Sequence, residues 1–542
     1  MTLDPSPRCG PVPQARSIGR ANQSGPRARA ALCALAASLA LSGCGWFGGS
    51  KSEATGVVGS VRGFLGGVSA AEPRAALVAR DILSGGGSAA DAAVAAALAL
   101  TVTLPSQAPL GGGGFCLVAI GSGRTRTVES VAFPAIAGAP DARIATPGIP
   151  RGLFALHARY GKLRWEQVVT PAESLARNGT QTTRALAIDV AAHAQRLAAD
   201  PILRDTFLPG GRPIVEGDRL VQPQTAAALG VLRSRGPGDL HQGQFARAMA
   251  QSFAAAGLAL PLDALGQGAV QLLPAIRVGE ANDLFVGAAP AAGALATGQI
   301  FAALEGRWRA TAPDDRPALL LSTAAAASRA RAEWLRADLS SALPMGEAMA
   351  AARLRALAGA GGEFAAEPDA PGGTSLVVID REGGAVACAL TGHTPWGIAR
   401  LPQGSAFLMA PAPVEGGADS RWLTVAIAMK DRSDVTFVGA ASGGAAAPMA
   451  LAQTALDTLQ GRETLARALD AARMQVRPDG SIGVDGAGLL AALGARGYRA
   501  GEVSGGIARV QAVHCPDGLV ASGATCRIET DRRGAGLAVG SN

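Results

Sequence analysis

The chain has 542 residues, which is too long for one small core and predicts several lobes or one large α/β unit. Its hydrophobic residues (48%) and charged residues (17%) exclude a disordered chain, and the scarcity of aromatic residues (4%) predicts a core built largely from Ala, Leu and Val. The net charge of +7 owes much to five arginines in the first thirty residues. No basic stripe interleaved with aromatic residues follows, which argues against nucleic-acid binding.

The N-terminal segment has the features of a secretory signal. Arg27 and Arg29 precede an apolar run over residues 30–41, which is too short to span a membrane. The run ends in Leu41-Ser42-Gly43-Cys44, which resembles a bacterial lipobox, whose Cys is lipidated and becomes the new N-terminus. We therefore expect a signal peptide over 1–43, a lipid on Cys44 and a flexible tether over 44–67. The protein would then face the periplasm, anchored by lipid to the membrane of a bacterial cell envelope. The alternative is a signal peptide with an incidental Cys.

Export to an oxidising compartment changes how the cysteines are interpreted. Cys515 and Cys526 flank a turn-like Pro-Asp-Gly and are predicted to form a disulfide. Cys116 and Cys388 lie in apolar runs and are predicted to be small buried hydrophobic side chains. Because no CxxC or HExxH motif occurs, we expect no metal site.

The first block of the mature chain predicts two helices and a buried strand. Gly85 to Gly87 would end a short helix, and Ser88 to Asp91 would cap an Ala-rich helix that runs towards Pro105. Four glycines at 111–114 then precede an apolar strand over 115–120. The glycine run lacks the Lys-Ser/Thr ending of a phosphate-binding loop, so we expect no nucleotide cofactor.

The rest of the chain divides into a helical block and a mixed block. Periodic apolar positions predict helices over 152–159, 165–177 and 222–234, and an Ala- and Arg-rich composition predicts long surface helices over 280–365. After Gly372, strands are predicted at 374–380, 385–390, 424–429 and 435–438, and a helix at 445–459. Strand hairpins in one layer and helices in others indicate a layered α/β sandwich.

Several segments, in the same order along residues 70–460, resemble the γ-glutamyltransferase (γ-glutamyltranspeptidase) family. Residues 87–96 resemble its G-N-A-x-D-A-A-V-A-A helix, and Pro105 with 111–115 resembles its P…GGGGF segment. Further matches lie at 147–161, 207–223, 374–391 and 441–444. The resemblance implies a four-layer αββα fold of the N-terminal-nucleophile hydrolases. It implies a large-subunit-like region over 68–373 and a small-subunit-like region over 374–542.

The resemblance also implies a reaction that needs no cofactor. In this family the precursor cuts itself just before a Thr, whose hydroxyl attacks the γ-glutamyl amide of a glutathione-like peptide while its freed amine takes the proton. Two backbone N–H groups, which correspond here to Gly443 and Gly444, hold the oxyanion. Water or an amino acid then resolves the acyl-enzyme.

The nucleophile's segment departs from the family pattern. Where the family has T-T-H-x-S-V-V-D, this chain, aligned on Asp380, places Gly373 in the first Thr's position and Thr374 one residue later. Neighbouring residues of a strand face opposite sides of the sheet. Thr374 therefore serves as nucleophile only if the strand shifts register or the backbone is irregular at Gly372-Gly373. The alternative is that Thr374 is an ordinary strand residue.

The substrate pocket departs from the family pattern as well. Ser130 replaces the Arg that the family uses to hold the substrate's carboxylate, and Arg126 is too distant along an ideal strand to take its place. Arg421 is either a replacement for the lost charge or a solvated residue. Three further matches are Thr391 near the nucleophile, His393 in place of an Asn, and Glu415, which aligns with the acid that receives the substrate's amine.

Two functions follow from these matches and departures. The first is a self-processing γ-glutamyl transferase or hydrolase that uses Thr374. The second is an uncut, non-catalytic lipoprotein with a binding or structural role in the cell envelope.

Overall fold

A computed structural model describes residues 60–62, 66–122, 125–139, 142–279, 282–287, 292–336, 372–413, 422–431, 433–461, 463–477, 479–520 and 525–541. The predicted signal peptide, Cys44, Glu415 and Arg421 lie outside the described residues. Residues from Val58 onward form one compact unit. Within the described part of this unit, no helix has the length and apolarity that a membrane crossing requires.

Two seven-stranded antiparallel sheets form the centre of this unit. The first, called the β12 sheet, has in spatial order β21 (Leu537–Ser541), β2 (Gly66–Ala70), β12 (Thr374–Asp380), β13 (Ala385–Thr391), β3 (Gly113–Ser122), β4 (Thr125–Phe133) and β9 (Gln271–Pro274). The second, called the β15 sheet, has β1 (Ser60–Arg62), β20 (Thr525–Thr530), β19 (Arg509–His514), β15 (Asp434–Ser442), β14 (Thr424–Lys430), β11 (Asp283–Val286) and β10 (Ile276–Val278).

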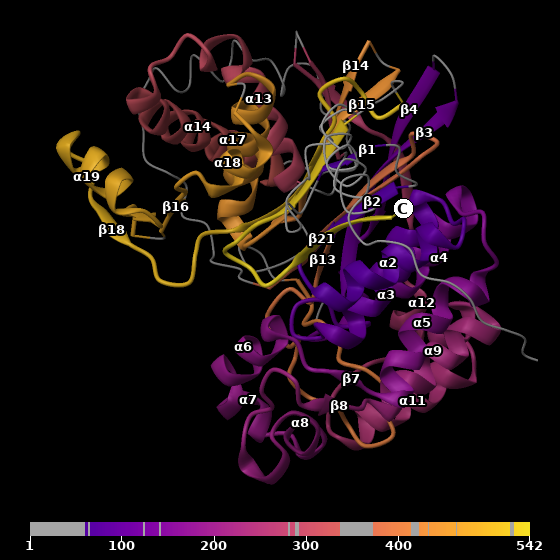
Figure 1. Cartoon of the computed structure of the whole chain (residues 1–542). Coiled ribbons are helices and arrows are strands. Elements are labelled where there is room, and N and C mark those ends of the chain that lie inside the picture. Colours follow the sequence, from indigo (N-terminus) through magenta and orange to yellow (C-terminus); the bar gives the residue numbers. More distant parts are fainter. Residues whose placement is uncertain are drawn as a thin grey trace, which may run out of the picture. The chain divides into compact units, whose positions relative to one another are not determined.

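Helices cover the outer face of each sheet (Figure 1). Helices α2 (Pro73–Ser84) and α3 (Ala89–Thr103) pack on the β12 sheet, while α13 (Ala292–Trp308) and α17 (Ala447–Leu459) pack on the β15 sheet. The inner faces of the two sheets contact each other through β12, β13 and β15. The predicted αββα sandwich is therefore confirmed.

Within the described residues, further elements surround the four layers. The remaining helices are α4 (Ile149–Tyr160), α5 (Trp165–Asn178), α6 (Arg184–Ala192), α7 (Ala194–Ala198), α8 (Pro201–Phe207), α9 (Pro223–Arg235), α10 (Gly238–His241), α11 (Gln244–Ala255), α12 (Leu262–Gly266), α14 (Arg316–Arg336), α18 (Leu465–Asp470) and α19 (Ala487–Ala495). The remaining strands are β5 (Ile136–Ala137), β6 (Ala145–Thr146), β7 (Thr180–Gln181), β8 (Arg219–Leu220), β16 (Met474–Val476), β17 (Ile482–Val484) and β18 (Ala500–Glu502). Single 3₁₀ turns are η1 (Pro209–Gly211), η2 (Pro313–Asp315) and η4 (Gly444–Ala446).

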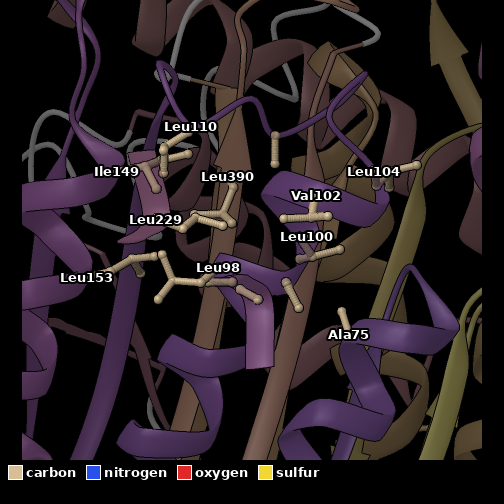
Figure 2. Close-up of a cluster of buried hydrophobic side chains, with 14 of the residues drawn as sticks. Ala75, Leu98, Leu100, Val102, Leu104, Leu110, Ile149, Leu153, Leu229 and Leu390 are labelled. Atoms are coloured by element: carbon tan, nitrogen blue, oxygen red, sulfur yellow. The ribbon is translucent and has the colours of Figure 1, made fainter. Parts of the chain in front are cut away.

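Helix α3 is buried along all 15 of its residues, which explains its Ala-rich sequence. Small side chains let this helix lie close to the β12 sheet and to its helical neighbours at once. Its start is fixed by the predicted cap: Ser88 accepts from the Asp91 N–H, and the Asp91 carboxylate accepts from the Ser88 N–H. Figure 2 shows Leu98 and Leu100 of α3 in the apolar cluster that includes Leu390 of β13.

The two faces of β12 have different surroundings, and this decides where the site residues lie. Leu376 and Val378 belong to the apolar cluster that includes α3, whereas Val377 and Ile379 belong to the cluster between the two sheets. The strand pairs with β13 without a register shift from Thr374 opposite Leu390 onward. Alternation therefore holds along the whole of β12.

Most predicted elements are confirmed with small shifts at their ends. The helices predicted in the helical block are α4, α5 and α9, the four predicted strands are β12 to β15, and the last predicted helix is the turn η4 followed by α17. The prediction of surface helices over 280–365 is wrong for α13, because its side chains pack between the β15 sheet and α14. The same stretch also contains β11, a strand that was not predicted from the sequence.

The end of the predicted tether belongs to the fold. Ser60–Arg62 pairs with β20, and Gly66 and Gly67 begin the buried strand β2. A Cβ on Gly67 would overlap the Ile528 side chain, so the glycines let the two sheets approach closely rather than making the chain flexible.

Both cysteine pairs of the folded unit are disulfides. The predicted Cys515–Cys526 disulfide is confirmed. The prediction that Cys116 and Cys388 are merely buried hydrophobic side chains is wrong, because they form a disulfide with Cα atoms 4.1 Å apart. They stand directly opposite each other on β3 and β13, 272 residues apart in sequence, and only the sheet register brings them together.

Asp457 on α17 provides a stability prediction with a definite sign. Burial raises its pKa to about 6, although the Trp308 indole N–H, which donates to Asp457 Oδ1 at 2.9 Å, acts in the opposite direction. The folded state therefore favours the protonated carboxyl. Its stabilisation is complete below the ordinary pKa of 3.8 and is lost as the pH rises through about 6.

We expect Asp457→Asn to gain stability relative to the parent protein as the pH rises, because Asn keeps an acceptor for Trp308 without a charge. Between pH 4 and pH 8 the difference in unfolding free energy should change by about 2–3 kcal/mol in favour of the variant. Urea unfolding at both pH values measures it, with Asp205→Asn as the control because the Asp205 side chain is 74% exposed. A difference that is the same at both pH values would contradict the prediction.

Candidate active site

The candidate site lies where β12 begins and where β13 and β15 end. The Thr391 hydroxyl, at the end of β13, donates to the Gly372 carbonyl at 3.1 Å and accepts from the His393 N–H at 2.8 Å. The Gly373 N–H donates to Gln107 Oε1 at 2.8 Å. These bonds fix the backbone just before Thr374 from two sides. Gln107 was not identified from the sequence, since its role depends on a contact 266 residues away.

Gly373 occupies the place that the family resemblance gives to the nucleophile. Its φ of +147° is one that L-residues rarely adopt. A Cβ built on it would lie 3.8 Å from the Ser442 Cβ and 3.9 Å from the Thr391 Cβ. The nearest atom is the Leu390 carbonyl oxygen at 3.3 Å, so a side chain at this position would lie beside the ends of β13 and β15.

Thr374 faces the other side of the β12 sheet. It shares a face with Leu376 and Val378, and therefore points towards α3 rather than towards the β15 sheet. The irregular backbone expected at Gly373 is present, but the register shift is not. The buried Thr374 Oγ1 has no hydrogen-bond partner among the described residues.

A cavity of about 290 Å³ opens at this end of β12. It is lined by Ala71, Leu104, Gln107, Arg184, Ala185, Ile188, Asp189, Gly373, Thr374, Ser442, Arg509, Arg532, Arg533, Gly534 and Ala535. Thr374 and Gly373 thus share one cavity with Ser442, the residue that precedes the Gly443-Gly444 pair. Among the described residues, no group of acids, histidines and cysteines is arranged to hold a metal ion.

The Gly443-Gly444 pair is required by the backbone path. The two residues have φ values of +121° and +62°, and a Cβ on Gly443 would come within 2.5 Å of the Ala508 Cα. The pair joins the end of β15 to η4 and α17, where backbone N–H groups lack helical partners. The tight turn geometry anticipated from the sequence is therefore present at the place where oxyanion donors are expected.

His393 lies outside the lining of the cavity. It is fully buried with φ +64°, and its ring Nδ1 is 2.8 Å from the Pro411 carbonyl oxygen. The ring therefore supports the loop after β13. Thr391 likewise acts through its hydrogen bonds to the backbone around Gly372, and not as a wall of the cavity.

Neither Ser130 nor Arg126 supplies a charge to this cavity. Ser130 is buried in the middle of β4, opposite Leu117 of β3. The Arg126 guanidinium donates to the carbonyls of Gly383 at 2.6 Å and Ser433 at 2.9 Å, and therefore ties together the turns of two hairpins. That Arg126 is too distant to take the place of the missing Arg stays a prediction.

Polar support for the site comes from residues that the sequence did not single out. The Asp189 carboxylate on α6 accepts from the Ser106 hydroxyl at 2.6 Å and from Gln107 Nε2 at 2.7 Å. Gln107 is thereby oriented so that its other amide atom accepts from Gly373. The only sequence signal was the position of Gln107 between Pro105 and the glycine run.

The family of this site is indicated by a match over most of the folded unit. Residues 75–410 match the family model described as gamma-glutamyltranspeptidase. The chain is 32% identical over 205 residues to the glutathione hydrolase proenzyme of Bacillus subtilis (strain 168), a match that covers 34% of this chain and 35% of that protein. It is 33% identical over 229 residues to the acylase ACY 1 proenzyme of Pseudomonas sp. (strain SE83), covering 38% and 41%. The chain thus spans less than half the length of these relatives.

Similarity to a solved structure extends over nearly the whole chain. The cephalosporin acylase from Bacillus halodurans superposes with a TM-score of 0.74 at 20% identity, covering 89% of this chain and 96% of that chain. At this identity the likeness concerns the fold alone. It confirms the predicted N-terminal-nucleophile hydrolase fold.

We expect Gly443→Ala to lower the unfolding free energy by about 2–4 kcal/mol, because the new Cβ meets the Ala508 backbone and the φ angle is unfavourable. Gly257→Ala is the matched control: its φ is +72° but nothing lies within 4 Å of a Cβ there. It should lose only about 1 kcal/mol. Equal losses in urea unfolding would show that close packing at Gly443 is unimportant.

Proposed function

Because the chain belongs to the γ-glutamyltranspeptidase family, we propose that it is a self-processing hydrolase or transferase of γ-glutamyl amides such as glutathione, with Thr374 as the nucleophile. The observation that carries the proposal is the Thr374 Oγ1, which is buried without a described partner on a residue that lines the same cavity as Ser442. A buried hydroxyl without a partner is costly, which favours a functional reason for keeping it. The protein would act at a bacterial membrane, facing the periplasm and anchored through Cys44.

The proposed reaction has two stages. Hydrolysis of the Gly373–Thr374 peptide bond leaves a carboxylate on Gly373 and frees the Thr374 amine. The Thr374 hydroxyl then attacks the γ-carbonyl carbon while its proton passes to that amine. The N–H groups at Gly443-Gly444 stabilise the oxyanion, and the proton then leaves with the departing amine. Water hydrolyses the resulting ester and restores Thr374, or an amino acid takes the acyl group.

The cut is what would allow Thr374 to reach the oxyanion donors. In the uncut chain the Gly373 N–H bond to Gln107 and the Thr391 bond to Gly372 hold the preceding backbone. Once Thr374 is the terminal residue, these two bonds no longer act on it through the chain, and its pairing with Leu390 remains. It can then turn about its own backbone bonds towards Ser442.

A second function is favoured by a different observation. Gly373 stands where the nucleophile should be, and Thr374 in the uncut chain faces α3. These facts favour an uncut lipoprotein that binds a ligand in the cavity without turning it over.

The two proposed functions predict different polypeptide masses when the full-length protein is purified in detergent, reduced and measured by mass spectrometry. We expect two polypeptides, the smaller one beginning at Thr374, and release of nitroaniline from γ-glutamyl-p-nitroanilide. Thr374→Ala should remain one chain without turnover, and Thr374→Ser should be cut. Ser375→Ala, which removes the neighbouring buried hydroxyl on the opposite face, should still be cut. A single uncut mass and no turnover in the parent protein would reject the enzyme in favour of the binding protein.

Because of the Cys116–Cys388 disulfide, a denaturing gel without a reductant should not separate the two products of the cut. Cys116 lies before the proposed cut and Cys388 after it, so the disulfide should hold the two products together under denaturing conditions. We expect one band on a non-reducing gel and two after reduction. Cys116→Ala/Cys388→Ala should give two bands without reductant. Cys515→Ala/Cys526→Ala should not, because both of these cysteines follow the cut. Separate bands from the alkylated, unreduced parent would show that the linking disulfide is absent.

A further inference from the structure

The cavity at Thr374 has an excess of positive charge. Four arginines line it, at positions 184, 509, 532 and 533, against the single carboxylate of Asp189. This carboxylate already accepts hydrogen bonds from Ser106 and Gln107. It is not ion-paired with any of the four arginines in the described part of the chain.

Two of the arginines are ion-paired within the protein. Arg533 binds the Asp485 carboxylate and donates to the Ala471 carbonyl at 2.8 Å. Arg532 lies 3.2 Å from the Asp470 carboxylate. Arg533 therefore serves the structure of the loop after β20, and either arginine would have to leave a carboxylate partner in order to hold a ligand.

The other two arginines have no carboxylate partner among the described residues. Arg184 is exposed at the start of α6, on the helical side of the cavity. Arg509 is half-buried at the start of β19, where it stands opposite Ser442 in the sheet pairing. Within the described part of the chain, its guanidinium makes only a long contact of 3.5 Å to the Arg533 carbonyl. A partly buried cation that is not paired favours an anionic ligand.

We propose that Arg184 and Arg509 hold a carboxylate of the acyl group while its amide carbonyl lies at Gly443-Gly444. This inference rests on the proposed function and names the residues that would select its substrates, which are amides of acids that carry a second carboxylate. The pairing of Arg509 with Ser442 places one cation beside the oxyanion turn, and α6 supplies the other to the lining of the same cavity. The role is separate from that of position 130, where Ser130 is buried in β4 and bears no charge.

The kinetic test compares γ-glutamyl-p-nitroanilide with its α-methyl ester, which lacks the carboxylate. We expect Arg184→Gln/Arg509→Gln to lower kcat/KM about 10- to 100-fold for the acid and to leave the value for the ester nearly unchanged. Arg499→Gln is the charge-matched control, because its side chain is 71% exposed and outside the cavity lining. An equal loss for acid and ester would overturn the proposal, as would an equal loss in the control.

A binding test separates this inference from the proposed function. Isothermal titration of the Thr374→Ala protein, which cannot turn over, should detect glutarate, with affinity lost in Thr374→Ala/Arg184→Gln/Arg509→Gln. Inorganic phosphate is the second probe, and it should bind more weakly if the cavity selects a carboxylate. Binding of glutarate without any cut or turnover in the parent would reject the enzyme and keep the site. Cutting and turnover without arginine-dependent glutarate binding would reject the site and keep the enzyme.

Discussion

The pairing of β12 with β13 is the constraint on which the candidate site depends. It begins with Thr374 opposite Leu390 and continues without a shift, so each residue of β12 has a fixed face. Apolar clusters fill both faces, one with α3 and one with the β15 sheet, and a one-residue slip would exchange them. A slip of β12 that moved Thr374 to the inter-sheet face would also move every other residue of the strand to the opposite face, out of the cluster in which it packs. The position of the hydroxyl in the uncut chain therefore follows from the core, and not from the chemistry of the site.

The same packing explains why small residues dominate the surroundings of the site. Helix α3 lies in full contact on all sides, which its alanines permit, and it holds the segment that carries Gln107. The Cys116–Cys388 disulfide joins β3 to β13 inside the β12 sheet, two strands that belong to different subunit-like regions. These regions are consequently parts of one core: β12 lies between β2 and β13, with neighbours from both sides of the proposed cut.

Local patterns in the sequence were sufficient to predict most helices and strands, but they were insufficient to predict the contacts between distant segments. The cap at Ser88, the strand limits of β12 and the glycine pair are written in adjacent residues and were predicted. The disulfide of Cys116, the hydrogen bond from Gly373 to Gln107 and the cavity wall at Arg509 join residues far apart, and no periodicity encodes them. Helix α13 was predicted to lie at the surface because its apolar pattern is weak. In the structure, the weak pattern reflects burial on several sides of the helix and not exposure.

The energetics of Thr374 distinguish the uncut chain from a cut one. Turning Thr374 towards Ser442 disrupts its pairing with Leu390, and it relieves a buried hydroxyl without a partner among the described residues, a burden of about 1–3 kcal/mol. In the uncut chain the same turn must also break the Gly373 bond to Gln107 and displace Gly372 from Thr391. The loss of these two further bonds, at about 1 kcal/mol each, opposes the turn. A glycine in the nucleophile's place is therefore compatible with catalysis only when the bond after it is broken, and the backbone around it is held as a substrate for that first cut.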